Sequence, residues 1–115
     1  MHVTIYHNPR CSKSRQTLEL IRSRGIEPEI IEYLETPPDT DTFWKILRML
    51  GMNPRQIMRT KEKEFREKGL DDESLGNDKL IEAMQEDPIL IERPIVIAGN
   101  KAVIGRPPEN VLDII

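Results

Sequence analysis

Residues 2–33 have the sequence HVTIYHNPRCSKSRQTLELIRSRGIEPEIIEY, and this stretch decides the fold class. Residues 2–6 alternate and are rich in β-formers, so they predict a strand. A helix is expected from Ser12, with Gly25 as its stop, and residues 29–33 predict a second short strand. A strand–helix–strand unit with short connections favours parallel pairing and a right-handed crossover, which is typical of an α/β fold.

The rest of the chain predicts a helical block followed by a hairpin. Pro37-Pro38 indicates a break after the second predicted strand, and helical patterns follow until Pro88. Residues 95–104 predict two strands joined by a two-residue turn, and a last short helix follows. We therefore expect a single domain over residues 1–115. Its order is βαβ, a helical insertion at about 39–88, and then ββα.

The composition indicates a well-solvated chain of about one domain. Of its 115 residues, 37% are hydrophobic and 32% are charged, and no apolar run is long enough for a spanning helix. The net charge of −3 gives no electrostatic case for nucleic acid, and we expect no membrane partner. A single cysteine, without a secretory signal pattern, predicts a reducing, cytoplasmic location.

Cys11 is the first candidate for chemistry, because it lies at the predicted strand-to-helix junction. Unpaired N–H groups and the positive end of the helix dipole favour the reactive thiolate there. Arg10, Lys13 and Arg15 add positive charge, and His7 is close enough in sequence to supply more. The same helix terminus suits an oxyanion. The alternative, an inert buried cysteine, fits poorly with polar neighbours on both sides.

Two further residues stand out near the expected strands. His7 precedes Cys11 by four residues, where it can tune the sulfur or orient its partners; the alternative is an ordinary hydrogen-bonded histidine. Pro94 leads straight into a predicted strand, where a tight turn explains it. One cysteine and two histidines give no recognisable metal spacing, so we expect no metal.

Three arginines are candidates for binding an oxyanion, because a guanidinium offers a planar fork of donors. Arg59 follows an apolar pair. Arg93 and Arg106 each precede a proline, at the two outer ends of the predicted hairpin, where they could converge on a ligand. Singly, each is better explained as a solvated or ion-paired surface arginine.

The charged run Lys61–Lys68 is dense enough in charge for an interaction patch. Its signs alternate, however, so that Glu62 with Arg66 and Glu64 with Lys68 make well-oriented i, i+4 pairs. We therefore expect a solvated helix there.

These segments together resemble the glutaredoxin-coupled arsenate reductase (ArsC) family, in its short, chromosomal type. The resemblance spans nearly the whole chain and rests on residues 5–15 (IYHNPRCSKSR), 33–38 (YLETPP), 89–96 (ILIERPIV) and 105–108 (GRPP). It implies a thioredoxin-like (glutaredoxin-like) fold with a helical insertion.

The resemblance also implies roles for individual residues. Cys11 looks like the family's nucleophile, and His7 like the histidine that helps set its reactivity. Pro94 would be the cis-proline that faces the thiol, and Ser14 stands where a dithiol enzyme has its resolving cysteine. The residues that resemble the oxyanion-binding arginines are Arg59, Arg93 and Arg106.

The implied activity is reduction of arsenate to arsenite without a bound cofactor. The Cys11 thiolate would attack arsenate, and because no second cysteine is present, glutathione would have to attack next as co-substrate. Glutaredoxin would then remove the glutathione by thiol–disulfide exchange. Arsenate, glutathione and glutaredoxin are thus the expected partners, and arsenic detoxification the expected role.

Two other functions stay open from the sequence. One is a regulator like the Spx proteins, which share this fold and bind RNA polymerase. Those with a redox switch use a CxxC pair, which Cys11 and Ser14 cannot form. The other is a monothiol oxidoreductase acting on another oxyanion or on glutathionylated proteins.

Overall fold

The computed structural model describes residues 1–115, which form two compact units. Unit 1 consists of Met1–Thr36 and Arg93–Ile115, and unit 2 consists of Pro37–Glu92. The bounds of unit 2 enclose the helical insertion expected at about 39–88. That the whole chain acts as one domain stays a prediction.

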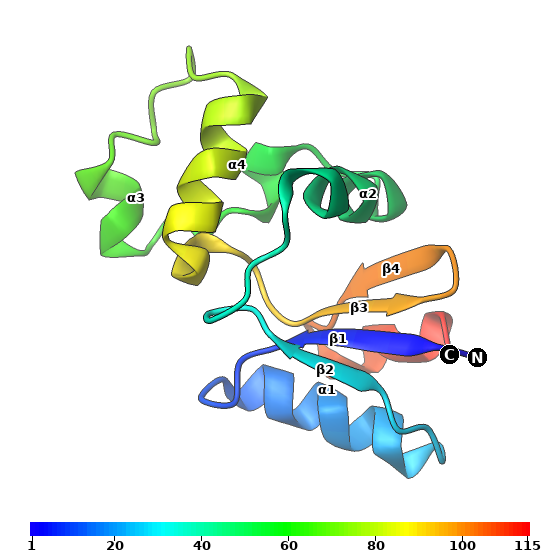
Figure 1. The fold of residues 1–115 in the computed structure, drawn as a ribbon. Helices are drawn as coiled ribbons and strands as arrows, with labels where there is room; N and C mark the ends of the chain where they lie inside the picture. Colours follow the sequence, from blue (N-terminus) through cyan, green and yellow to red (C-terminus); the bar gives the residue numbers. More distant parts are fainter. The chain divides into compact units, whose positions relative to one another are not determined.

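Unit 1 is built on a four-stranded sheet of order β2-β1-β3-β4 (Figure 1). Its strands are β1 (Val3–His7), β2 (Glu29–Glu32), β3 (Ile95–Ala98) and β4 (Lys101–Ile104). β1 pairs in parallel with β2 and antiparallel with β3, and β3 pairs antiparallel with β4. This mixed sheet confirms the predicted α/β class, the parallel βαβ unit and the hairpin.

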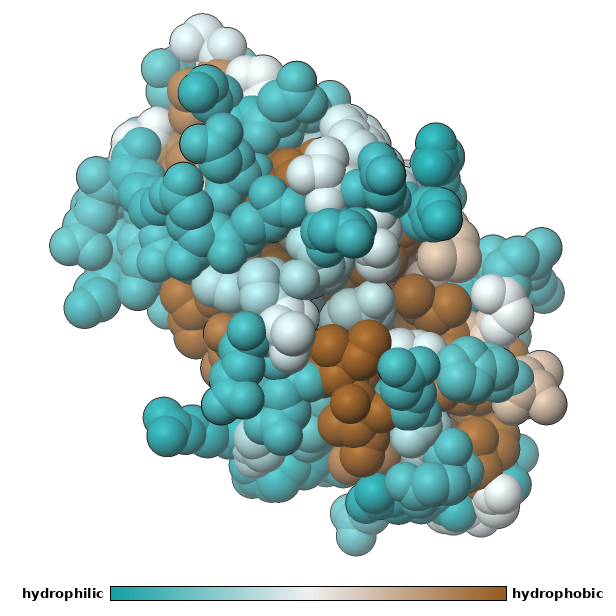
Figure 2. Space-filling model, in the orientation of Figure 1, coloured by the Kyte–Doolittle hydropathy of each residue, from teal (hydrophilic) through white to brown (hydrophobic).

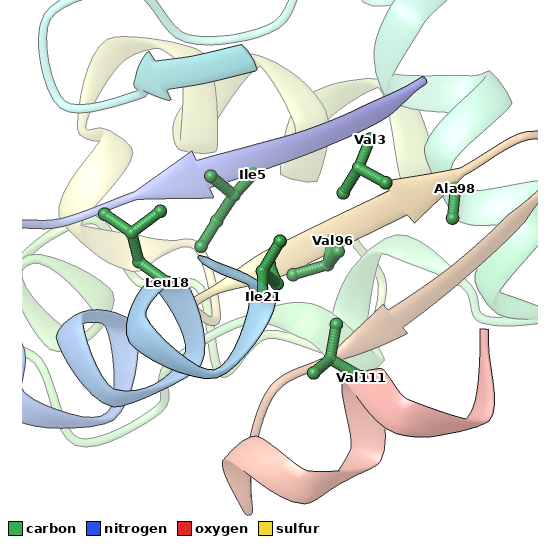
Figure 3. Packing of buried hydrophobic residues seen from close by; sticks show 7 residues of the cluster. All are labelled: Val3, Ile5, Leu18, Ile21, Val96, Ala98 and Val111. Atoms are coloured by element: carbon green, nitrogen blue, oxygen red, sulfur yellow. The ribbon is translucent and has the colours of Figure 1, made fainter. Parts of the chain in front are cut away.

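One apolar cluster joins the sheet of unit 1 to α1 (Ser12–Ser23) and to the 3-10 helix η3 (Pro108–Asp113). Figure 3 shows its seven buried residues, which come from β1, α1, β3 and η3: Val3, Ile5, Leu18, Ile21, Val96, Ala98 and Val111. Both helices therefore cover the same face of the sheet. The last predicted helix is η3.

The buried stripe of α1 changes from apolar to polar toward its N-terminus. Its members follow the i, i+3, i+4, i+7 spacing of one helix face: Ser14, Thr17, Leu18 and Ile21. The two apolar members pack into the core, and the two polar ones lie at the end next to Cys11. Because side chains alternate along a strand, His7 lies on the same face of β1 as Ile5. That is the face that α1 covers.

Unit 2 consists of helices joined by turns and by a longer loop over residues 68–76. They are α2 (Thr40–Leu50), η1 (Pro54–Ile57), α3 (Lys63–Glu67), α4 (Asn77–Glu86) and η2 (Pro88–Leu90). The largest fully buried side chains of these helices and 3-10 turns are all apolar: Phe43, Ile46, Leu47, Ile57, Leu80, Ile81, Met84 and Leu90. Asp39 caps α2 by accepting a hydrogen bond from the Thr42 N–H, and Asn53 with Gln56 forms a capping box on η1.

The solvated helix predicted over Lys61–Lys68 exists in a shorter form, with other ion pairs. α3 covers only five of these residues and buries no side chain. The pairs that form are Lys68 with Glu86 at 2.7 Å, Lys68 with Asp87 at 2.8 Å, and Arg59 with Glu62 at 2.7 Å. The carboxylates around Lys68 come from the end of α4, which no local spacing rule indicates.

The face of the molecule shown in Figure 2 is mostly hydrophilic, with smaller apolar areas between the polar side chains. This agrees with a chain in which 32% of the residues are charged. Among the helices of the structure, none combines the length and the apolar character needed to cross a membrane.

Candidate active site

Cys11 is the N-cap residue of α1, at the junction predicted from the sequence, and it is half-buried. Asn8 holds the turn that carries it. The Cys11 N–H donates to the Asn8 carbonyl oxygen, and the Arg10 N–H donates to Asn8 Oδ1, both at 3.0 Å. Arg15 Nη1 adds a hydrogen bond to the Pro9 carbonyl oxygen at 2.9 Å. The backbone is therefore fixed on both sides of the thiol.

The surroundings of Cys11 favour its ionised form. Burial raises the pKa of this thiol. The N–H groups of Ser14 and Lys13 and the charge of Arg93 outweigh burial, so the net pKa lies below its ordinary value of 9.0. Both N–H groups belong to the first turn of α1, where they lack partners within the helix. Because the thiolate is the nucleophilic form, this is the environment of a reactive cysteine.

Arg93 and Arg106 lie at the two ends of the β3–β4 hairpin, and both act on the Cys11 sulfur. Arg106 Nη1 donates to Cys11 Sγ over 3.8 Å. Arg93 lowers the pKa of the thiol by its charge and by a hydrogen bond. The peptide bonds that follow them, to Pro94 and to Pro107, are both cis. The structure thus brings two of the three candidate arginines to the thiol.

Gly105 permits the close approach between the hairpin and α1 that places Arg106. Its N–H donates to the Pro94 carbonyl oxygen at 2.9 Å, and its carbonyl oxygen accepts from Thr17 Oγ1 at 3.3 Å. A Cβ atom on this residue would lie 2.6 Å from Thr17 Oγ1 and 2.9 Å from Pro94 Cγ. No residue with a side chain fits here without moving one of the two elements.

His7 is buried at the end of β1, and Ser14 connects it to α1. Ser14 Oγ lies 2.7 Å from His7 Nδ1 and accepts a hydrogen bond from the Asn8 N–H at 3.0 Å. The Ser14 side chain has no exposed surface. One hydroxyl therefore joins the strand, the turn before the thiol and the first turn of the helix.

The structure corrects the expectation that His7 adds positive charge near the thiol. Burial is the main cause that holds the pKa of His7 below its ordinary value of 6.5, against the opposing charge of Glu32. The ring is therefore largely neutral at neutral pH. The contact the structure gives it is the hydrogen bond to Ser14.

Arg59 lies in unit 2 and has partners there. Its Nη2 pairs with Glu62 at 2.7 Å, and its Nη1 donates to the Ile89 carbonyl oxygen at 3.4 Å. The groups assembled around the thiol come from unit 1. A role for Arg59 in binding an oxyanion stays a prediction from the resemblance.

Several residues of the site have a function that the sequence did not reveal: Asn8, Thr17, Gly105 and Asn110. The Asn-Pro dipeptide is a turn signal that indicates the part played by Asn8. Asn110 Nδ2 donates to the carbonyl oxygens of Ile104 and Arg106 at 3.1 and 3.2 Å, which fixes the segment that carries the arginine. The Thr17–Gly105 contact joins positions 88 residues apart, so no local pattern predicts it.

The arrangement suits attack by a thiolate on an anionic centre. Guanidinium groups and backbone N–H groups can hold an oxyanion at the sulfur and offset the charge that develops during attack. No group of three or more His, Cys, Asp or Glu side chains in the structure could hold a metal ion.

The chain is similar over nearly its full length to proteins of one family. The model of the ArsC family matches residues 6–114. The uncharacterized protein YfgD of Escherichia coli strain K12 is 56% identical over 114 residues, covering 98% of this chain and 96% of YfgD. An arsenate reductase of Neisseria meningitidis strain MC58 is 48% identical over 110 residues, covering 95% of this chain and 94% of the relative.

A solved structure agrees with these matches. An arsenate reductase from Vibrio cholerae is 50% identical and superposes with a TM-score of 0.96, covering 100% of this chain and 98% of the other. Similarity at this level confirms the predicted thioredoxin-like fold. The order of the motifs, the fold and the match to the family model agree, and they show that the chain belongs to the ArsC family.

Proposed function

We propose that this chain is an arsenate reductase that depends on glutathione and glutaredoxin, with Cys11 as its nucleophile. The observation that carries the proposal is the contact between Arg106 Nη1 and Cys11 Sγ at the N-terminus of α1. A guanidinium, which is a group suited to binding oxyanions, thus lies beside a sulfur whose pKa is lowered. Full-length relatives named arsenate reductase support the choice of substrate.

The first step is attack of the Cys11 thiolate on arsenic. A sulfur–arsenic bond forms and an arsenic–oxygen bond breaks, and the leaving hydroxide is protonated to water. Arg93 and Arg106, with the N–H groups of the first turn of α1, bind the remaining oxygens and offset their charge. Arsenic is still in the +5 state after this step.

The second step needs a thiol from outside, because Cys11 is the only cysteine and Ser14 cannot resolve the adduct. The glutathione thiolate attacks the Cys11 sulfur, so that a disulfide forms and the sulfur–arsenic bond breaks. The bonding pair stays on arsenic, which leaves as arsenite in the +3 state, while the two sulfurs together lose two electrons. Glutaredoxin then attacks the glutathione sulfur and releases the Cys11 thiolate.

A coupled assay tests this proposal. NADPH oxidation is followed with arsenate, glutathione, glutathione reductase and glutaredoxin, using the wild type and Cys11→Ser. We expect turnover by the wild type and a loss of at least about a hundredfold in the variant, since the nucleophile is removed. Wild-type turnover no higher than that of Cys11→Ser would reject arsenate as the substrate.

The arginines are tested in the same assay. Arg93→Ala and Arg106→Ala should raise the KM for arsenate about tenfold or more, because each removes a charge-assisted contact to the oxyanion. Alkylation of Cys11 by iodoacetamide, measured at alkaline pH, should change much less. Arg24→Ala removes an exposed arginine at the far end of α1 and serves as control. Slower alkylation with an unchanged arsenate dependence would overturn these roles. Arg59→Ala, measured alongside, tests the prediction for that residue.

A further inference from the structure

We propose that Arg10 and Lys13 form a cationic rim that recruits a small anionic thiol, of the class to which glutathione belongs, to Cys11. The inference rests on the proposed function and deepens it, because it names the residues that recognise the second substrate.

The backbone places both side chains next to the thiol. Arg10 directly precedes Cys11, and its N–H is held by Asn8 Oδ1 at 3.0 Å. Lys13 lies in the first turn of α1, and its N–H is one of the groups that lower the pKa of the Cys11 sulfur. Both side chains are exposed. They therefore start from a fixed backbone beside the sulfur and extend into solvent.

Neither side chain forms an ion pair with a carboxylate in the structure. Elsewhere the exposed Arg22 pairs with Glu27 at 2.9 Å, and Lys68 pairs with two carboxylates. The chain has 20 acidic and 17 basic residues, so carboxylates are plentiful. Two unpaired cations beside the reactive sulfur are thus available to an anion that arrives from solvent.

The cations of the site divide into two groups. Arg106 contacts the sulfur, and the charge of Arg93 acts on it. The side-chain charges of Arg10 and Lys13 are not among the causes of the low pKa of Cys11. Arg93 and Arg106 are suited to the oxyanion that bonds to the sulfur. Arg10 and Lys13 are suited to the molecule that attacks afterwards.

The second step of the reaction has an electrostatic difficulty that the rim removes. Glutathione carries two carboxylates and one ammonium group, so it is a net anion at neutral pH. It has to approach an adduct that also carries negative charge. Nearby cations offset this repulsion and raise the local concentration of the thiol. The two cations of the rim equal in number the two carboxylates of such a thiol. A protein partner would instead contact a surface much larger than two side chains.

Disulfide probes of different charge test the rim without arsenate. Because Cys11 is the only cysteine, every exchange signal belongs to it. Its rates with Ellman's reagent (anionic), 4,4′-dithiodipyridine (neutral) and cystamine (cationic) are compared for the wild type and Arg10→Ala/Lys13→Ala. The control, Arg24→Ala/Lys101→Ala, removes two exposed cations of unit 1 from the other end of α1 and from the start of β4.

At low ionic strength the rim variant should react about three- to tenfold more slowly with the anionic probe. Its rate with the neutral probe should change by less than about twofold, and its rate with the cationic probe should rise. About 0.5 M salt should abolish the differences, because exposed charges are screened. The control variant should keep all three wild-type rates. Equal slowing with all probes, or no slowing with the anionic one, would overturn the proposal.

The coupled assay then separates the two candidate anions and the two proposals. The rim variant should raise the KM for glutathione and leave kcat at saturating glutathione unchanged. A raised KM for glutaredoxin with an unchanged KM for glutathione would overturn the proposal in favour of a protein partner. If the wild type turned over arsenate but the variant kept its glutathione KM, the rim would be wrong and the proposed function would stand. If the wild type showed no arsenate turnover, the proposed function would fail. The rates with the three disulfide probes would still show whether Arg10 and Lys13 recruit anions to Cys11.

Discussion

The Ser14 hydroxyl connects two other parts of the site, the end of β1 and the turn before Cys11. It accepts from the Asn8 N–H and bonds His7 Nδ1, and it is fully buried. Ser14→Ala leaves both buried groups without this partner, so we expect the free energy of unfolding to fall by about 1–3 kcal/mol. Urea denaturation measures the change.

Ser12→Ala is the matched control for that substitution. Ser12 is the first residue of the same helix and is exposed, so its loss should change stability by no more than about 0.5 kcal/mol. If Ser14→Ala were no more destabilising than Ser12→Ala, the hydroxyl would not hold the turn of Cys11 in place.

His7 gives the site a dependence on pH. Its folded-state pKa is lowered, mainly by burial, so the unfolded chain takes up a proton at higher pH than the folded one. The corresponding stabilisation is fully present above the ordinary pKa of 6.5 and is lost as the pH falls through the folded pKa. Across a pH series of urea unfolding, the wild type should therefore lose stability on acidification more steeply than His7→Gln. The exposed His2 provides the control, His2→Gln, and parallel curves for wild type and His7→Gln would contradict the idea.

The environment of Cys11 could be predicted from its neighbours in the sequence, whereas the charge state of His7 could not. Polar neighbours and a helix start are local features, so the thiolate-favouring position of Cys11, which is half-buried, could be predicted. The charge state of His7 depends on burial under α1, and burial comes from packing between distant segments. The hydrogen bond to Ser14 follows from the alternation of β1 and the stripe of α1 taken together. Neither pattern shows it alone.

At the scale of elements, the meeting of α1 with the β3–β4 hairpin determines where Arg106 lies. Gly105→Ala would place a Cβ 2.6 Å from Thr17 Oγ1 and 2.9 Å from Pro94 Cγ, so the hairpin has to move away from the helix. We expect a loss of about 1–3 kcal/mol in stability from this overpacking. The KM for arsenate should rise as well, because Arg106 shifts with the hairpin. Urea unfolding and the coupled assay measure the two effects.

A second substitution tests that explanation. Thr17→Ala removes the side-chain atoms that a Cβ on Gly105 would meet first, while the contact with Pro94 remains. In a double-mutant cycle, Gly105→Ala should therefore cost less in the Thr17→Ala background than in the wild type. Strict additivity would mean that the glycine is not required for this approach.

The elements that could be predicted are those whose pattern is local. The strands and the Gly99-Asn100 turn follow from alternation and turn chemistry, and they lie where expected to within one or two residues. The run Lys61–Lys68 was predicted less well. Long charged side chains reach partners outside their own helix, as Lys68 does with Glu86 and Asp87. Spacing within one element carries no information about such partners.

At the scale of the whole molecule, the chain leaves unit 1 after Thr36 and returns to it at Arg93. Pro37-Pro38 marks the first place and Pro88 lies a few residues before the second, which is why the insertion could be bounded from the sequence to within a few residues. How its helices are divided was less clear, because η1 and η2 are single 3-10 turns whose ends are set by caps and prolines. Prolines therefore indicate roughly where the insertion begins and ends, whereas the division of the insertion into separate helices depends on how they pack.

Each unit has its own buried apolar residues, and this predicts that their stabilities can be changed separately. Met84 is fully buried in α4, so Met84→Ala should cost about 2–5 kcal/mol. Hydrogen exchange should show that amides of α2 and α4 lose more protection than those of β1 and β3. Ile21→Ala, an equally buried change in unit 1, should show the reverse order. Because the chain passes between the units at only two places, a cavity in one core weakens its own helices or strands first. An equal loss of protection in both units would instead show that they unfold together.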